Sequence, residues 1–246
     1  MPTTPEYLDF AGIAHTVDEL KRDRRLGDMV RRAGIAQSCI ADLREAADCV
    51  EAADRSIDGW SEEAVRRDNS VVEAALLLSA VVLYARATST DAKKGERGPV
   101  QIASTLNPEQ RVDHEALLTV RNRALAHVYA GDHVDGVRWH QTAICLVSGD
   151  DGWQGAALVR RVSVERETLA RLKRQIPIAT DTIQAVFQKR LAQALTLLTE
   201  SVTAVEFDVI RRKHAFDAVR FLGSAATVEE VLASRSRGWA RGTLIS

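Results

Sequence analysis

The sequence predicts a mainly α-helical bundle that carries one inserted β-hairpin. Over most of the chain, apolar residues recur at spacings of three and four, which is the pattern of helices that bury one face. Residues 137–164 differ, because two stretches rich in β-branched, aromatic and apolar residues flank the turn-forming segment Gly149-Asp150-Asp151-Gly152. The 246 residues, 46% of them hydrophobic, suffice for one large core or two small ones, and we predict a single helical domain over residues 1–246.

Helix start and stop signals divide the first part of the chain. Thr16-Val17-Asp18-Glu19 has the form of a capping box, so we expect a helix from there to Arg31-Arg32 that ends at Gly34. A second helix is expected from about Ile35 to Ile57. Ser61 would cap a third helix through about Thr88. Residues 71–84 of this third helix are apolar on nearly every side, which predicts the centre of the bundle.

We find neither a membrane span nor a signal peptide. The longest apolar run, residues 74–85, is shorter than the roughly 18 residues that a span requires. The N-terminus lacks a basic start followed by an apolar core. We therefore expect a soluble, cytoplasmic protein that does not bind a membrane. The three cysteines, Cys39, Cys49 and Cys145, form no CxxC pair and no metal-ligand spacing with histidine, so we predict reduced thiols and neither a metal nor a cofactor.

The second half of the chain has its own helix signals. Asn107-Pro108-Glu109-Gln110 supplies an N-cap, a proline at the first helical position and a glutamine at the third, and the helix it opens should stop at Gly131. Beyond Pro177, apolar residues at helical spacing over 187–209 predict one long helix, and Thr227-Val228-Glu229-Glu230 would cap a short final helix. The basic tail, residues 235–246, is expected to be a disordered terminus, with contact to RNA or a partner as the alternative.

The charges of the chain nearly cancel. It has 33 Lys+Arg against 34 Asp+Glu, so no global positive field favours nucleic acid and any polyanion site must be local. The helix that begins at Asn107 offers such a site in Arg121-Asn122-Arg123-Ala124-Leu125-Ala126-His127. This segment combines a phosphate-binding cation, an amide and the one type of side chain that ordinarily titrates near neutral pH.

The same helix is apolar on two sides. On a wheel of about 100° per residue, His127 falls on a stripe of small residues, and Arg121 and Arg123 lie at its two edges. Such a stripe favours close approach of a second helix, for which a symmetry mate is a natural source. Arg121 and His127 point roughly 120° apart, so they converge most easily where two copies of the helix meet. This predicts a homodimer. The small-residue stripe is Val112, Ala116, Val120, Ala124 and Val128, and the opposite one is Leu118, Leu125 and Tyr129.

Each polar residue of this helix also has a structural explanation. His127 could be a core histidine bonded to a carbonyl, and Arg121 a solvated helix arginine. Arg123 lies four residues before His127, which makes it the closer geometric neighbour and a weak candidate for substrate binding, although a surface ion pair is its more ordinary role. His114, one heptad before Arg121, is a second weak substrate-binding candidate, or else a residue at the rim.

A helical bundle whose late helix carries Arg, a polar residue, four variable residues and His resembles the HEPN superfamily (higher eukaryotes and prokaryotes nucleotide-binding). The matching residues are Arg121, Asn122 and His127, and the resemblance covers about 25 residues firmly and the helical remainder loosely. It implies a HEPN-like bundle, a homodimer with two such helices facing each other, and a metal-independent endoribonuclease of toxin–antitoxin or anti-phage systems. The implied partners are RNA and an antitoxin or nucleotidyltransferase. The hairpin is a departure from a plain bundle.

The resemblance assigns the catalytic roles to Arg121, Asn122 and His127. His127 would act as general base or acid while a ribose 2′-OH attacks the adjacent phosphorus, and Arg121 would stabilise charge on the phosphorane oxygens. Asn122 would bind the phosphate or orient His127. Two alternatives stay open: a non-catalytic HEPN-like module that binds RNA, a nucleotide or a protein, and a purely structural helical scaffold.

Overall fold

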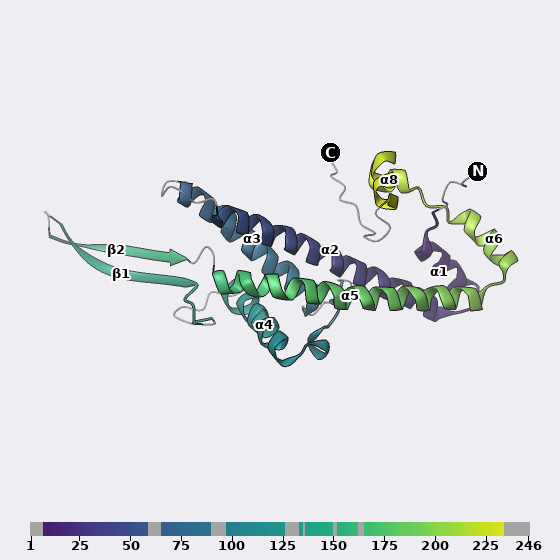
Figure 1. Ribbon diagram of the computed structural model, residues 1–246, viewed down its shortest axis with the longest axis horizontal. Helices are drawn as coiled ribbons and strands as arrows, with labels where there is room; N and C mark the ends of the chain where they lie inside the picture. Colours follow the sequence, from purple (N-terminus) through teal and green to yellow (C-terminus); the bar gives the residue numbers. More distant parts are fainter. Residues whose placement is uncertain are drawn as a thin grey trace. The chain divides into compact units, whose positions relative to one another are not determined.

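The computed structural model describes residues 7–58, 65–89, 97–125, 133–134, 136–149, 152–161 and 165–233 (Figure 1). These residues are mainly helical and carry one antiparallel β-hairpin, which confirms the predicted fold class at the level of secondary structure. The α-helices are α1 (Phe10–Glu19), α2 (Arg24–Asp58), α3 (Val65–Thr88), α4 (Pro108–Thr119), α5 (Arg166–Ser201), α6 (Ala204–Lys213), α7 (Ala218–Leu222) and α8 (Ala225–Ala233). The short helical turns are η1 (Ala103–Thr105) and η2 (Val120–Leu125), and the strands are β1 (His140–Gly149) and β2 (Gly152–Arg161).

The chain packs into two compact units. Unit 1 consists of residues 1–34 and 186–246, and unit 2 consists of residues 35–185. Helices α2 and α5 each contribute residues to both units. The single helical domain expected over residues 1–246 stays a prediction.

The helix boundaries predicted near the N-terminus are wrong. Helix α1 begins at Phe10, after Asp9 accepts a hydrogen bond from the backbone N–H of Ala11, and not at the sequence Thr16-Val17-Asp18-Glu19. The chain turns at Lys21, whose φ is 55°, and Asp23 then accepts from the N–H of Arg25 at 2.8 Å as α2 begins. Gly34 lies inside α2 and does not end it, so the two helices expected on either side of Gly34 are one.

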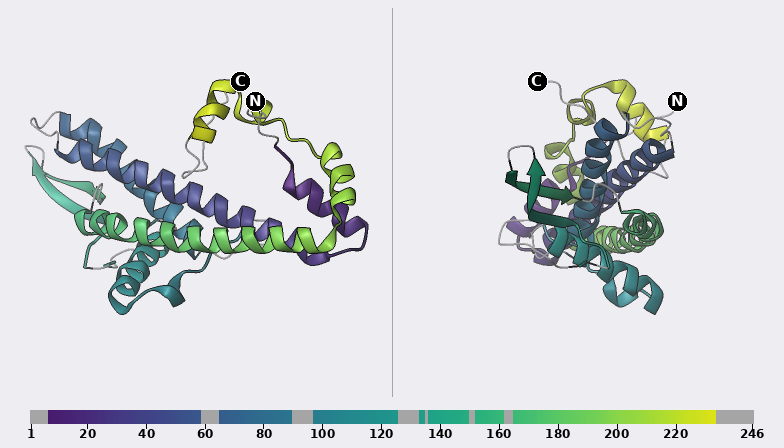
Figure 2. Two further views of the ribbon diagram at one scale, coloured as in Figure 1. Left: turned by 45° about the vertical axis from the view of Figure 1, so that its right-hand side comes forward. Right: turned by 90° about the vertical axis from the view of Figure 1, so that its left-hand side faces the viewer.

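Unit 1 has a small apolar core between α1, the first turns of α2, the last part of α5, and α6 (Figure 2). The segment before α1 is paired with the segment after α6, since the Asp9 N–H donates to the carbonyl of His214 at 2.8 Å. The His214 ring also lies on α1, with Nε2 2.8 Å from the Thr16 hydroxyl. The fully or nearly buried core residues are Ile13, Ala14, Val17, Leu26, Ala194, Leu198 and Ile210.

Helix α3 of unit 2 is less uniformly buried than predicted. Leu77 and Tyr84 are fully buried, whereas Val71 and Val72, about two turns after its start, are 71% and 56% exposed. Over Val71–Thr88, α3 is long and apolar enough to cross a membrane by length and composition, which the shorter run over residues 74–85 did not indicate. Half of that stretch is buried inside the protein, as in a core helix, and it is the one such stretch among the described residues. This is compatible with a soluble protein.

The helices after the hairpin also differ from prediction. Helix α5 begins at Arg166 and contains Pro177, whose missing N–H falls on an exposed position of the helix. The predicted single long helix ends at Ser201, and Thr203 caps α6 through the N–H of Glu206 at 3.2 Å. The short final helix is confirmed as α8, although Ser224 accepts the capping bond and Thr227 donates it through its N–H. The tail 235–246 lies outside the described residues.

The β-hairpin is confirmed within shorter bounds than 137–164. Strands β1 and β2 pair from His140 opposite Arg161 to Gly149 opposite Gly152, so the two strands meet at the predicted glycines, and residues 150–151 between them lie outside the described residues. Gly152 has a φ of 101°, a conformation that glycine adopts without strain. Residues 162–164, the last of the predicted strand, lie outside the described residues.

Candidate functional site

Helix α4, which leads to the candidate motif, begins as predicted. The Asn107 side chain accepts from the N–H of Gln110 at 2.9 Å, and the Gln110 side chain accepts from the N–H of Asn107 at 3.0 Å. Pro108 occupies the start of the helix, where its missing N–H costs no hydrogen bond. The capping box thus fixes the start of the motif helix locally.

The helix changes from α to π geometry at Val120. Helix α4 ends at Thr119, and Val120–Leu125 forms the π-helical turn η2, in which each hydrogen bond spans one residue more than in an α-helix. A wider turn advances each residue by less than the about 100° of an α-helix. The wheel angles predicted for Arg121 and Arg123 assumed a continuous α-helix and do not hold beyond Val120. Single π turns within helices are frequent at functional sites.

The face that α4 and η2 bury within this chain shares only Val120 with the predicted stripes, among the residues that the structure describes. His114, Leu117 and Val120 are buried at spacings of three, and α3 packs against both α4 and η2. Val112 is 62% exposed and Leu118 is half-buried, so neither the small-residue stripe nor its opposite forms a single buried face. The remaining stripe residues, Ala124, Leu125, Val128 and Tyr129, lie outside the side chains that the structure describes, so the two apolar sides stay a prediction.

Arg121 and Asn122 are joined by a direct hydrogen bond. The Arg121 guanidinium donates from Nη1 to Oδ1 of Asn122 at 2.9 Å. Arg121 is half-buried, and Asn122 and Arg123 are exposed. An exposed amide and a guanidinium held together in this way present hydrogen-bond donors to solvent next to one another, as a phosphate ligand requires.

His127 lies within residues 126–132, which are outside the described part of the chain. Its expected proximity to Arg121 therefore stays a prediction, as does the end of the motif helix at Gly131.

His114 is a core residue, so the expectation that it lies at a rim or contacts substrate is wrong. Its side chain is 2% exposed, and Nδ1 lies 2.8 Å from the hydroxyl of Tyr84, which is itself fully buried in α3. The two rings meet edge to face with centroids 5.7 Å apart. A buried ring that contacts another buried ring has no surface to offer a substrate. The pair instead fastens α4 to α3 just before the motif.

Burial also changes the protonation of this pair. Removal from water lowers the pKa of His114, opposed by the nearby carboxylate of Glu115, so the neutral imidazole is favoured. Burial raises the pKa of the Tyr84 hydroxyl, and the negative charge of Asp113 raises it further. Both groups are therefore uncharged at neutral pH, as a buried hydrogen-bonded pair requires.

An ion network that the sequence did not reveal ties α4 to α5. The Asp113 carboxylate accepts from Arg174 at 2.8 Å and lies 3.3 Å from Nε of Arg171. The hydrogen bond from Arg174 lowers the pKa of Asp113, although partial burial opposes it. These residues are 58 and 61 positions apart in sequence, so no local pattern could have paired them. A groove beside the network follows the first turns of α4, whereas Arg121 comes after the last turn.

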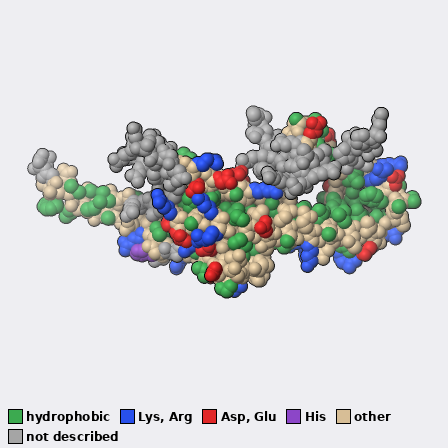
Figure 3. All heavy atoms as spheres, in the orientation of Figure 1, with side chains coloured by type: hydrophobic (Ala, Val, Ile, Leu, Met, Phe, Trp, Pro, Cys, Tyr) green, Lys and Arg blue, Asp and Glu red, His purple; other side chains and the backbone are tan. Residues whose placement is uncertain are grey.

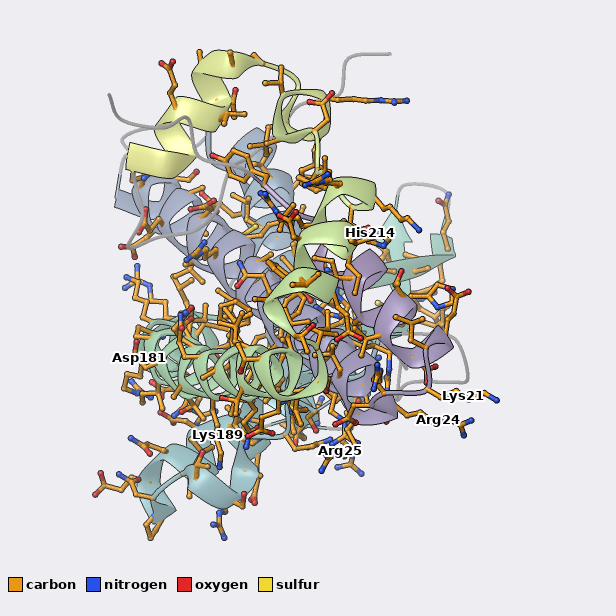
Figure 4. All side chains as sticks on the ribbon, turned by 90° about the vertical axis from the view of Figure 1, so that its right-hand side faces the viewer. Lys21, Arg24, Arg25, Asp181, Lys189 and His214 are labelled. Carbon is orange, nitrogen blue, oxygen red and sulfur yellow. The ribbon has the colours of Figure 1, made fainter. Side chains whose placement is uncertain are left out.

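The basic segment at the start of α2 is largely paired with acids. Lys21, Arg24 and Arg25 project outward (Figure 4). Arg25 lies 2.7 Å from Asp23, and Arg24 lies 3.7 Å from Asp18. These ion pairs are those of an ordinary solvated surface.

Comparison with known proteins identifies no relative for this chain: no protein-family model, no curated protein and no solved structure matches it. The functional assignment therefore depends on the motif and its surroundings alone.

Proposed function

We propose that this protein is a metal-independent endoribonuclease of HEPN type, acting in the cytoplasm as a homodimer. The observation that carries the proposal is the Arg121–Asn122 hydrogen bond on the π-helical turn at the end of α4. It unites two of the three motif residues on a helix that a capping box and a buried Tyr84–His114 pair hold in place.

The proposed reaction needs only groups that this segment contains. His127 removes the proton from a ribose 2′-OH, whose oxygen attacks the adjacent phosphorus while the bond to the 5′-oxygen breaks. The departing 5′-oxygen receives a proton from a second His127, contributed by the other copy. The products are a 2′,3′-cyclic phosphate and a 5′-OH. Arg121 stabilises the negative charge that develops on the phosphorane oxygens.

The proposal is tested with purified protein and a labelled single-stranded RNA in the presence of EDTA. We expect cleavage without a divalent metal, no cleavage of DNA of the same sequence, and a 2′,3′-cyclic phosphate end. His127→Ala should reduce the rate by about 10²–10⁴-fold, the usual contribution of general acid–base catalysis. Arg121→Ala should reduce it by about 10²-fold or more.

Arg123→Ala is the matched control, because Arg123 is exposed on the same turn and should contribute only weakly. Circular dichroism of each variant establishes that the fold is retained. Cleavage that appears only with added metal overturns the mechanism, and a larger effect of Arg123→Ala than of Arg121→Ala reassigns the phosphate ligand. RNA binding without cleavage by the wild type would favour a non-catalytic HEPN-like module.

The same resemblance extends the proposal to a toxin or anti-phage effector controlled by an antitoxin or nucleotidyltransferase. Expression of the wild-type chain should then inhibit bacterial growth, and His127→Ala should relieve the inhibition at equal protein level.

A further inference from the structure

The β-hairpin exposes an unusual amount of apolar surface. Ile144 is 80% exposed, Leu146 70%, Trp153 72% and Val159 64%. Figure 3 shows hydrophobic side chains along most of the hairpin, which extends away from helices α3 and α4 of the same unit (Figure 1). An isolated two-stranded hairpin is at best marginally stable in water. A hairpin with this much apolar surface therefore requires a second surface that removes its side chains from water.

The strand register places the largest of these side chains on one face. Residue Ile144 pairs with Ala157, Leu146 with Gly155, and Ser148 with Trp153, and alternate pairs share a face of the ribbon. We call this the apolar face and define it as Ile144, Leu146, Trp153, Ala157 and Val159. The opposite face holds Val147 and Leu158 with smaller residues between them.

Between its two ends, the hairpin has no charged residue in either strand. Residues 141–149 and 152–159 contain no Asp, Glu, Lys or Arg, and no proline. Such residues are the usual devices that keep exposed strands from associating. Within residues 141–161, the charged residues stand only at the two ends: Asp150 and Asp151 in the sequence between the strands, and Arg160 and Arg161 as the last residues of β2.

We propose that the apolar face packs against the same face of a second copy of this chain. The arrangement is isologous, with the two hairpins antiparallel across a twofold axis. Antiparallel packing brings the acidic turn of each hairpin to the basic end of the other, whereas parallel packing would bring the two acidic turns together. A second copy of the hairpin carries the complementary charges at its two ends, so it is the partner that these charges favour. The same charges favour antiparallel over parallel packing.

The size of the face fits a reversible dimer. Large side chains with these exposed fractions each expose roughly 100–200 Å² of surface. The apolar face therefore has an exposed area on the order of 500 Å² per copy. Two copies would bury on the order of 1,000 Å², near the lower limit of specific interfaces. Association should therefore depend on concentration. This interface does not require the ribonuclease proposal, because it uses no residue of the Arg121–His127 segment.

Sedimentation velocity of the full chain over a concentration series tests the interface. We expect the average mass of the wild type to rise with concentration. At the highest concentration, the average mass of Ile144→Lys should be half that of the wild type or less. Leu158→Lys is the matched control, because it places the same charge on the opposite face of the same hairpin at a residue that is 59% exposed. It should associate like the wild type.

A charge exchange tests the direction of packing. Arg161→Glu should weaken association at low salt, and adding Asp151→Arg should restore it. A wild type that stays monomeric, an Ile144→Lys variant of unchanged mass, or equal effects of Ile144→Lys and Leu158→Lys would each overturn the proposal. Because the readout is mass, a failure here is distinct from a failure to cleave RNA.

Discussion

At the scale of single residues, the candidate site depends on how two neighbouring side chains are held. Arg121 and Asn122 are adjacent in sequence, and adjacent positions on a regular helix point in different directions. Their hydrogen bond forms on a π-helical turn, where the arginine bends back to its neighbour. The same turn follows directly on a helix whose buried face is set by His114 and Val120.

His114 shows why residue type alone did not reveal a role. A histidine one heptad before an arginine satisfies the spacing of a site residue, yet its ring is buried against Tyr84. Its importance lies in holding α4 on α3. Removing the Tyr84 hydroxyl would leave a buried ring nitrogen without its partner, which typically costs about 1–3 kcal/mol.

The buried His114 predicts a pH dependence of stability. Its pKa is lowered in the folded protein from an ordinary value of 6.5, so the unfolded chain binds the proton more tightly. The contribution of neutral His114 to the free energy of unfolding is complete above pH 6.5, the pKa in the unfolded chain. It is lost as the pH falls from 6.5 toward the lower pKa of His114 in the folded protein. We expect the free energy of unfolding to decrease over this range more for the wild type than for His114→Asn. Urea denaturation at a series of pH values measures this.

The difference between the two proteins cancels the contributions of the other histidines. The carboxylate of Asp113 does not interfere, because its pKa is lowered below 3.8 and it titrates at more acidic pH. Parallel pH profiles for the wild type and His114→Asn would contradict the assignment of a neutral, buried His114.

At the scale of elements, the glycines of the first two helices illustrate how context overrides a stop signal. Gly34 has the residue type that commonly ends a helix, but it is exposed in the interior of α2, between buried Ala33 and Ala36. The buried neighbours keep the helix continuous. The left-handed turn that separates α1 from α2 occurs instead at Lys21, a residue that seldom adopts it.

These glycines give a paired prediction. Gly34→Ala should stabilise the protein by about 0.5–1 kcal/mol, since a Cβ there meets nothing within 4 Å and alanine loses less entropy in a helix. Gly12→Ala should destabilise it by about 1–3 kcal/mol, because a Cβ there would lie 2.5 Å from Nδ1 of His214. The Thr16 hydroxyl holds that ring in place. Chemical denaturation measures the free energy of unfolding of both variants. If both substitutions changed it in the same direction, the packing of His214 on α1 would be contradicted.

At the scale of the whole molecule, the near balance of charge constrains how the proposed RNA substrate would be bound. The formal net charge is −1, and the cations at the start of α2 are largely paired with acids. Under the proposed function, attraction of RNA would come from a few local contacts centred on Arg121. A protein with a broad basic surface would behave differently, because each phosphate contact adds to the salt dependence of binding.

The salt dependence of RNA affinity tests this. With the non-cleaving His127→Ala variant, we expect the logarithm of the affinity to fall with the logarithm of salt concentration with a slope of about −1.5 to −3, corresponding to roughly two to four phosphates at about −0.7 each. Adding Arg121→Ala should make the slope shallower by about 0.7. Arg25→Ala is the control, because Arg25 is already paired with Asp23, and it should leave the slope unchanged. A steeper slope would indicate a wider basic surface.

Local signals in the sequence were sufficient for several elements. The Asn107–Gln110 capping box forms as predicted, because both hydrogen bonds join residues three apart. The hairpin forms where it was predicted, with Gly149 opposite Gly152, because stretches rich in β-branched, aromatic and apolar residues and a turn-forming segment act over short range. The candidate motif of Arg121 and Asn122 was also visible, since its residue types and spacing are properties of the chain itself.

The tertiary structure decided what depends on distant neighbours. The burial of His114 requires Tyr84 from α3, and the charge of Asp113 is set by Arg171 and Arg174 from α5. The π turn at Val120 and the continuity of α2 through Gly34 likewise do not follow from local pattern. The physical reason is common to all of them: the free energy of burying a side chain depends on groups far along the chain, and it can exceed the small preferences that local sequence imposes.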